Sequence, residues 1–309
     1  MTQGKEMEYG KSDEPEIMID IAAAEAVPLT EAFDHKIDPM GTGFKWYIPP
    51  SATTKEHNAA GHEWAISGHD MQVLTTTVPP GETITTEVGT FMYMAPFMTT
   101  EVELTCCSKG GCGEAWQRIC SGESCVKVYL INESGDEGYV GLTPNFPAKI
   151  IPVKFGTHVQ SGGSLIAQGG AIMTQLGEVD IACDFDKNPA TCCCSGFGCC
   201  RQRLTGPDGS MAFLNAGGTI MYRHLEDGES VIVDTNSIVA IEDTVQVGLS
   251  PNGRLFTCCF GGESCFSTRL SGPGRVFMQS YSFQKFAAAV DQTVMEDRGG
   301  SGEDLGGVA

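Results

Sequence analysis

Between about Ala65 and Phe283, short apolar runs alternate with turn residues. The runs include TITTEVGTFMYM, SLIAQGGAIMTQ and SVIVDTNSIVAI, and Gly, Pro, Asn and Asp separate them. Runs rich in β-branched residues and bounded in this way are typical of strands. Because no helical period is sustained here, the pattern predicts an all-β core over residues 64–283.

The segments on either side of this core differ from it in composition and in hydrophobic pattern. Residues 1–63 mix acids, alanines and three histidines without sustained periodicity, which predicts an irregular acidic N-terminal arm, part of it packing on the core around WYIPPS. Residues 284–309 begin with the helix-forming stretch QKFAAAVDQTVM and end in a glycine-rich acidic tail. We expect a short helix there, followed by a disordered tail.

The core also repeats itself. The stretches PGETITTEVGTFMYM, SGGSLIAQGGAIMTQ and DGESVIVDTNSIVAI share a glycine turn, an apolar strand and a second turn, and a later hairpin with Arg and Gly follows each. The glycines assigned to these structural turns are Gly81, Gly162, Gly228, Gly122, Gly206 and Gly272. Repeats of this size leave an apolar face that the next one covers. We expect three units, about 64–145, 146–217 and 218–283, closing into a compact pseudo-threefold body.

Each unit contains a cysteine-rich tip: TCCSKGGCGEAW, TCCCSGFGCCRQR and TCCFGGESCF. Since the tips occupy equivalent places, closure would bring them to one end as a single interaction surface. The candidates for interaction, lipidation or metal binding are Cys106, Cys107, Cys112, Cys193, Cys194, Cys199, Cys200, Cys258, Cys259, Cys265, Phe197, Phe260 and Phe266.

Several interpretations of these cysteines stay open. Cysteine is a small apolar residue that packs well in hairpins. Zinc sites use thiolates, although the spacings here are at or beyond the wide end of the usual range. Adjacent cysteines beside phenylalanines also suit S-palmitoylation, and nearby bases suit redox chemistry. We predict no cofactor and keep zinc as the alternative.

The net charge and the absence of common enzyme motifs narrow the range of expected functions. The net charge of −20 repels phosphate backbones and disfavours nucleic-acid binding. No G-x-S-x-G, H-E-x-x-H or phosphate-loop motif occurs, so no enzyme is predicted. No run of about 18 apolar residues occurs, and the first residues carry neither a secretory nor a transit signal. We expect a cytoplasmic protein with reduced thiols, with a mitochondrial location as the alternative.

The segments GGSLIAQGGAIMTQLGEVDI, RICSGESC, GESVIVDTNSIVAI and RLSGPGRVFMQS resemble the domain-of-unknown-function family 124, which includes the altered inheritance of mitochondria protein twenty-four. The resemblance implies a fold similar to the tryptophan RNA-binding attenuator protein, a variant of the double-stranded β-helix. It also implies three attenuator-like units in a pseudo-threefold array that self-associates. It supplies no catalytic residues.

Together these observations predict a non-enzymatic scaffold or membrane-organising protein that self-associates through its β faces. Its further partners would be a membrane-associated protein or, through lipidation, a membrane. The alternative is a thiol- or zinc-dependent binding protein or enzyme that uses the clustered cysteine hairpins.

Overall fold

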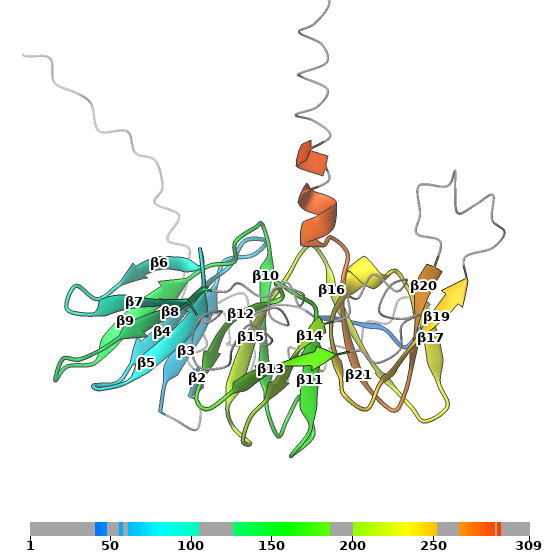
Figure 1. The fold of residues 1–309 in the computed structure, drawn as a ribbon, viewed down its shortest axis with the longest axis horizontal. Coiled ribbons are helices and arrows are strands. Elements are labelled where there is room, and N and C mark those ends of the chain that lie inside the picture. The colour runs from blue at the N-terminus through cyan, green and yellow to red at the C-terminus, as the bar shows by residue number, and fades with distance from the viewer. Residues whose placement is uncertain are drawn as a thin grey trace, which may run out of the picture.

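The computed structural model describes residues 41–47, 56–57, 61–104, 126–185, 200–251, 266–287 and 289–291. These residues form antiparallel β-sheets, with one short 3-10 helix, η2 (Thr235–Ser237), and a C-terminal helix over 283–287 and 289–291 (Figure 1). The predicted all-β class is confirmed.

The strands follow one another closely along the chain. Those before residue 145 are β1 (Lys45–Tyr47), β2 (Glu56–His57), β3 (Glu63–Ser67), β4 (Val73–Val78), β5 (Thr83–Glu87), β6 (Phe91–Met94), β7 (Thr99–Leu104), β8 (Val126–Ile131) and β9 (Gly138–Leu142). The next are β10 (Lys149–Lys154), β11 (Ser164–Ala167), β12 (Ile172–Leu176), β13 (Asp180–Phe185), β14 (Cys200–Thr205) and β15 (Met211–Ala216). The last are β16 (Ile220–Leu225), β17 (Ser230–Val233), β18 (Ile238–Glu242), β19 (Gln246–Pro251), β20 (Phe266–Ser271) and β21 (Gly274–Gln279).

These strands form four sheets. One has the order β1-β16-β21-β18-β11-β14-β13, and a second has the order β10-β15-β12-β5-β8-β7. The other two are β2-β3-β4-β9-β6 and β17-β20-β19. The first two sheets each join strands that are far apart in the sequence, through the pairs β11·β18 and β5·β12.

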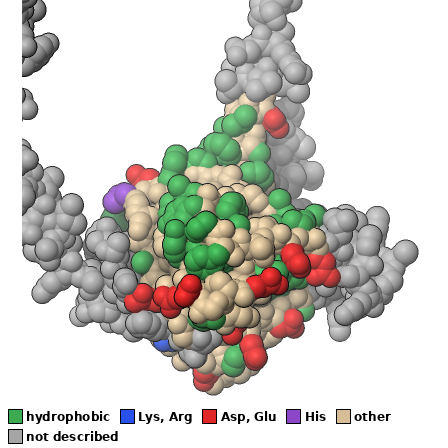
Figure 2. All heavy atoms as spheres, turned by 90° about the vertical axis from the view of Figure 1, so that its left-hand side faces the viewer, with side chains coloured by type: hydrophobic (Ala, Val, Ile, Leu, Met, Phe, Trp, Pro, Cys, Tyr) green, Lys and Arg blue, Asp and Glu red, His purple; other side chains and the backbone are tan. Residues whose placement is uncertain are grey.

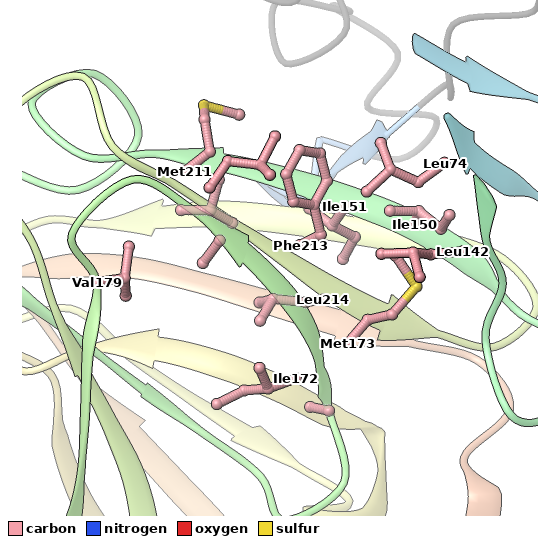
Figure 3. Close-up of a cluster of buried hydrophobic side chains, with 14 of the residues drawn as sticks. Leu74, Leu142, Ile150, Ile151, Ile172, Met173, Val179, Met211, Phe213 and Leu214 are labelled. Atoms are coloured by element: carbon pink, nitrogen blue, oxygen red, sulfur yellow. The ribbon is translucent and has the colours of Figure 1, made fainter. Parts of the chain in front are cut away.

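The hydrophobic core lies between these sheets, and it follows from the alternation in the sequence. In β4, the sequence VLTTTV buries every second residue, as a strand with one face on the core should. Strands β11, β15 and β18 are buried along their whole length. The Trp64 and Phe213 rings pack edge to face, with their centroids 5.1 Å apart. Figure 3 shows Phe213 in a cluster with apolar side chains from β4, β9, β10 and β12.

Two findings change the expected outline. First, β1 and β2 lie within the N-terminal stretch predicted to be irregular, where β1 pairs with β16 and buries Tyr47. Second, none of the four sheets closes, and β6 and β17 lie at opposite ends of the molecule (Figure 1). The expected closure into a compact body is therefore not observed among the described strands, because the two long-range pairings extend the body in one direction.

Candidate functional site

One end of the molecule exposes a group of large apolar side chains around β6. They are Val88, Phe91, Met92, Tyr93, Phe97 and Tyr139, and we call them the β6 face. Figure 2 shows hydrophobic side chains gathered on this end of the molecule, with acidic side chains on both sides. A large exposed apolar patch on a protein surface usually marks an interaction site.

The aromatic part of the β6 face is held in place by neighbouring strands. The hydroxyls of Tyr93 and Thr75 are hydrogen-bonded, with 2.7 Å between the oxygens. The Tyr93 ring lies 6.3 Å from the Tyr139 ring, centroid to centroid. It also covers Gly141 so closely that a Cβ there would collide with the ring. Two rings of the face, those of Tyr93 and Tyr139, are therefore held by contacts within the molecule.

A second candidate is a polar cluster at the β11·β18 pairing. The Arg203 guanidinium donates to Asp184 Oδ1 through Nη2 (2.7 Å), to Ser164 Oγ (2.6 Å) and to Asp243 Oδ2 (3.2 Å). The Ser164 hydroxyl donates to Asp243 Oδ2 at 2.6 Å. This cluster therefore links β14, β11 and the chain after β18 through side-chain hydrogen bonds.

An open groove of about 650 Å³ lies beside this cluster, among the turns around Gly162, Gly177, Glu178 and Gly206. A neighbouring hollow of about 410 Å³ includes Glu178, Asp208 and His62. The His62 ring is bonded through Nδ1 to the Thr77 carbonyl at 3.0 Å. The groove is wide and is formed mainly by turns.

A buried histidine also has a structural explanation. The backbone N–H of Lys154 donates to His158 Nδ1 at 2.9 Å, and Arg275 Nη1 donates to the His158 carbonyl at 2.7 Å. Burial lowers the pKa of His158 to about 3, with the positive charges of Arg275 and Lys154 acting in the same direction. The imidazole is therefore neutral near pH 7, and it fixes the turn between β10 and β11.

The sequence candidates fall mostly outside the described residues. Among the cysteines and phenylalanines of the tips, the structure describes only Cys200, which starts β14 opposite Phe185, and Phe266, which starts β20 opposite Pro251. Cys106, Cys107, Cys112, Cys193, Cys194, Cys199, Cys258, Cys259, Cys265, Phe197, Phe260 and the turn glycine Gly122 lie outside them. The proposed gathering of the tips is therefore untested.

The other turn glycines are described. Gly81, Gly162 and Gly228 each precede a strand with φ of 79°, 73° and 79°, values that residues with a side chain rarely adopt. Gly206 and Gly272 follow β14 and β20, in the turns that lead to β15 and β21.

Neither a metal centre nor a membrane span is found in the described part of the chain. No group of three or more His, Cys, Asp or Glu residues there has the geometry to hold a metal ion. No helix within the described ranges is long and apolar enough to cross a bilayer.

Comparison with known proteins gives the family. The model of the family described as mitochondrial biogenesis AIM24 matches residues 64–281, most of the chain. The chain belongs to the AIM24 family. This confirms the resemblance seen in the sequence, and it matches the β body without the N-terminal arm. AIM24 membership carries no specific biochemical role with it.

A solved structure supports the fold. The crystal structure of a Streptococcus pyogenes protein is similar to this AIM24 chain with a TM-score of 0.57 and 17% sequence identity, covering 75% of this chain and 99% of that one. At this identity the likeness concerns the fold alone. No curated protein matches the chain.

The β6 face was missed by sequence reasoning, although a signal was present. The run FMYM in β6 is four apolar residues without an alternating polar position. Such a run reads as a strand buried on both faces. Only the sheet order reveals that β6 is an edge strand and that the run is exposed.

Proposed function

We propose that this AIM24-family protein is a non-enzymatic scaffold that self-associates through its β-sheets, and that its body consists of three copies of one attenuator-like unit. The observation that carries the proposal is the β6 face, an exposed apolar surface at one end of the body. The first copy runs from β4 to β9, the second from β10 to β15 and the third from β16 to β21.

The strand pairing supports the three copies. In the first, β4 pairs with β9, β5 with β8, β6 with β9 and β7 with β8. In the second, β10 pairs with β15, β11 with β14, β12 with β15 and β13 with β14. In the third, β16 pairs with β21, β17 with β20, β18 with β21 and β19 with β20. Each copy thus pairs its six strands in the same order.

A shared irregularity supports the same division. The register between the third and sixth strands shifts at one residue in each copy, and those residues are Met92, Met173 and Val239. Each lies eleven residues after the glycine that opens its turn. A bulge at an equivalent place is a feature of a common unit, since bulges are retained where they shape a sheet.

The cross-strand pair that follows the shift contains one aromatic residue in each copy. The pairs just after the shift are Tyr93 with Gly141, Thr174 with Phe213, and Ala240 with Phe277. Two copies place the large ring on the sixth strand, whereas the first places it on the third. The Tyr93 ring lies over Gly141. Each copy thus places one aromatic ring in this cross-strand pair, on one strand or the other.

The surroundings of the β6 face favour a protein partner. Acidic side chains flank it in Figure 2, and acids repel the anionic lipids that attract basic segments. The thiol- or zinc-dependent alternative rests on the cysteine tips, of whose candidate residues the structure describes only Cys200 and Phe266. The proposed scaffold therefore assembles through apolar and sheet contacts.

The test is sedimentation velocity on the full-length chain over a wide concentration range. We expect the sedimentation coefficient to rise with concentration. Met92→Asp should keep the protein monomeric, because it puts a charge into the apolar contact. Val290→Asp, which changes an exposed apolar residue of the C-terminal helix, serves as the control and should assemble normally. A monomeric wild-type chain at every concentration would contradict the proposal.

A further inference from the structure

The two sheets that cross between copies are built in the same way. In one, the first, sixth and third strands of the second copy (β10-β15-β12) continue into the second, fifth and fourth strands of the first (β5-β8-β7). In the other, β16-β21-β18 of the third copy continue into β11-β14-β13 of the second. The remaining sheets are the two halves of this arrangement: β4-β9-β6, extended by β3 and β2, and β17-β20-β19.

The two internal junctions also share one register. Thr86 lies opposite Thr174 at the β5·β12 junction, and Ala167 lies opposite Ala240 at the β11·β18 junction. In both, the residue five after the glycine of one copy faces the residue twelve after the glycine of the next. The same rule applied to the two half sheets places Val233 of β17 opposite Tyr93 of β6.

Burial shows what the junctions cover and what the half sheets leave open. Met173 and Val239 at the junctions are fully buried, at 0% exposure, whereas their counterpart Met92 is 55% exposed. On the facing strands, Ile166 is 6% exposed and its counterpart Ile232 is 53% exposed. Both edges that a third junction would use are thus apolar and open to solvent in the described structure.

We propose that β6 of one molecule pairs antiparallel with β17 of a second molecule, with Val233 opposite Tyr93 and Ile232 opposite Met94. This inference rests on the proposed self-association and specifies its surface. Within one chain the two strands lie at opposite ends (Figure 1), so the partner is another copy. The five-stranded and three-stranded half sheets then join into one sheet of the junction type.

The backbone chemistry of the edges fits this pairing. At the internal junctions the carbonyl at the bulge accepts a bond from the facing copy: Val239 O from Gln168 N at 2.9 Å, and Met173 O from Thr86 Oγ1 at 3.1 Å. The counterpart acceptor on β6 is Met92 O, and the counterpart of Gln168 N is the backbone N–H of Asp234.

The side chains of the two edges also lack the usual protection. The strands read FMYM and SVIV, without the lysines, inward charges or prolines that block unwanted pairing at sheet edges. Pro96, which follows β6, is the counterpart of Asp243, whose backbone N–H donates to the Ser164 carbonyl across the β11·β18 junction at 3.1 Å. Proline has no backbone N–H to donate. The ladder between copies is therefore expected to be one backbone bond shorter than that junction.

The pairing uses two different surfaces, so each molecule keeps one free edge of each kind and assembly continues until a ring closes or a filament forms. This predicts a complementation experiment. Met92→Asp blocks β6 and leaves β17, whereas Ile232→Asp blocks β17 and leaves β6. Each variant alone should be monomeric, with association weakened about 100-fold or more by the unpaired charge. An equimolar mixture should form a one-to-one dimer, detected by native mass spectrometry with one variant labelled with ¹⁵N.

Other outcomes overturn the proposal. If Ile232→Asp alone still self-associates, β17 is not the partner edge of β6. If Met92→Asp alone self-associates, β6 is not needed. Wild-type assembly without complementation by the mixture would leave a scaffold that uses another surface, whereas a monomeric wild type would contradict the proposed function as well. Met92 and Ile232 are both exposed, so neither substitution is expected to unfold the protein. Unchanged melting curves exclude loss of folding as the cause. The lysine pair Met92→Lys and Ile232→Lys repeats the experiment with the opposite charge.

Discussion

The internal junctions and the free edges of β6 and β17 carry the same kinds of strands but differ in what covers them. At the junctions, the third strand of one copy and the second strand of the preceding copy bury each other. At the ends of the body, the corresponding strands expose apolar side chains. If the body consists of three copies as proposed, the two free edges correspond to the two sides of an internal junction, and the proposed pairing with a second molecule would cover them.

The largest expected contrast concerns stability at equivalent methionines. Met173→Ala should lower the free energy of unfolding by about 2–5 kcal/mol, because it leaves a cavity in the core between copies. Met92→Ala at the counterpart position should change it by less than about 0.5 kcal/mol in the monomer, since Met92 is exposed. Denaturant titration of both variants checks this, and equal losses would contradict the assignment of Met92 to a free edge.

Acid should weaken the region where the second and third copies meet. The pKa of His158 is lowered to about 3, mainly by burial, so below about pH 6.5 the unfolded chain binds a proton that the folded chain does not. Stability should therefore fall with decreasing pH, by about 2 kcal/mol from this group between pH 7 and pH 5.

The matched control for this prediction is His158→Asn, which keeps an acceptor for the Lys154 N–H but does not titrate. Its unfolding free energy should depend less on pH than that of the wild type over the same range. An identical pH dependence in the two proteins would show that the His158 proton is not responsible.

A smaller contrast is expected at two arginines. Arg203 donates to Asp184, Ser164 and Asp243 at the β11·β18 junction, whereas its counterpart Arg269 on β20 is exposed. Because Arg203 is itself partly exposed, Arg203→Ala should cost about 1–2 kcal/mol and Arg269→Ala less than about 0.5 kcal/mol. Thermal unfolding in parallel measures both. A larger loss for Arg269→Ala would contradict the comparison.

The sequence predicts much of this fold and little of the site. The alternation in VLTTTV and the glycine turns at Gly81, Gly162 and Gly228 are local signals, and they predict strands well. The exposure of FMYM is not local, because it depends on whether β6 has one neighbouring strand or two. The pairing of Tyr93 with Gly141, which puts the aromatic ring on the third strand instead of the sixth, is likewise visible only once the register is known.

Hydrogen exchange of the backbone amides of β6 and β17, measured as the protein concentration is raised, tests the proposed pairing of the two edges. We expect exchange to slow in both strands together, while the amides of the buried junction strands β11 and β18 stay protected at every concentration. Met92→Asp should abolish the slowing in both strands. Slowing in β6 without β17, or no dependence on concentration in a protein that assembles, would contradict pairing of these two edges.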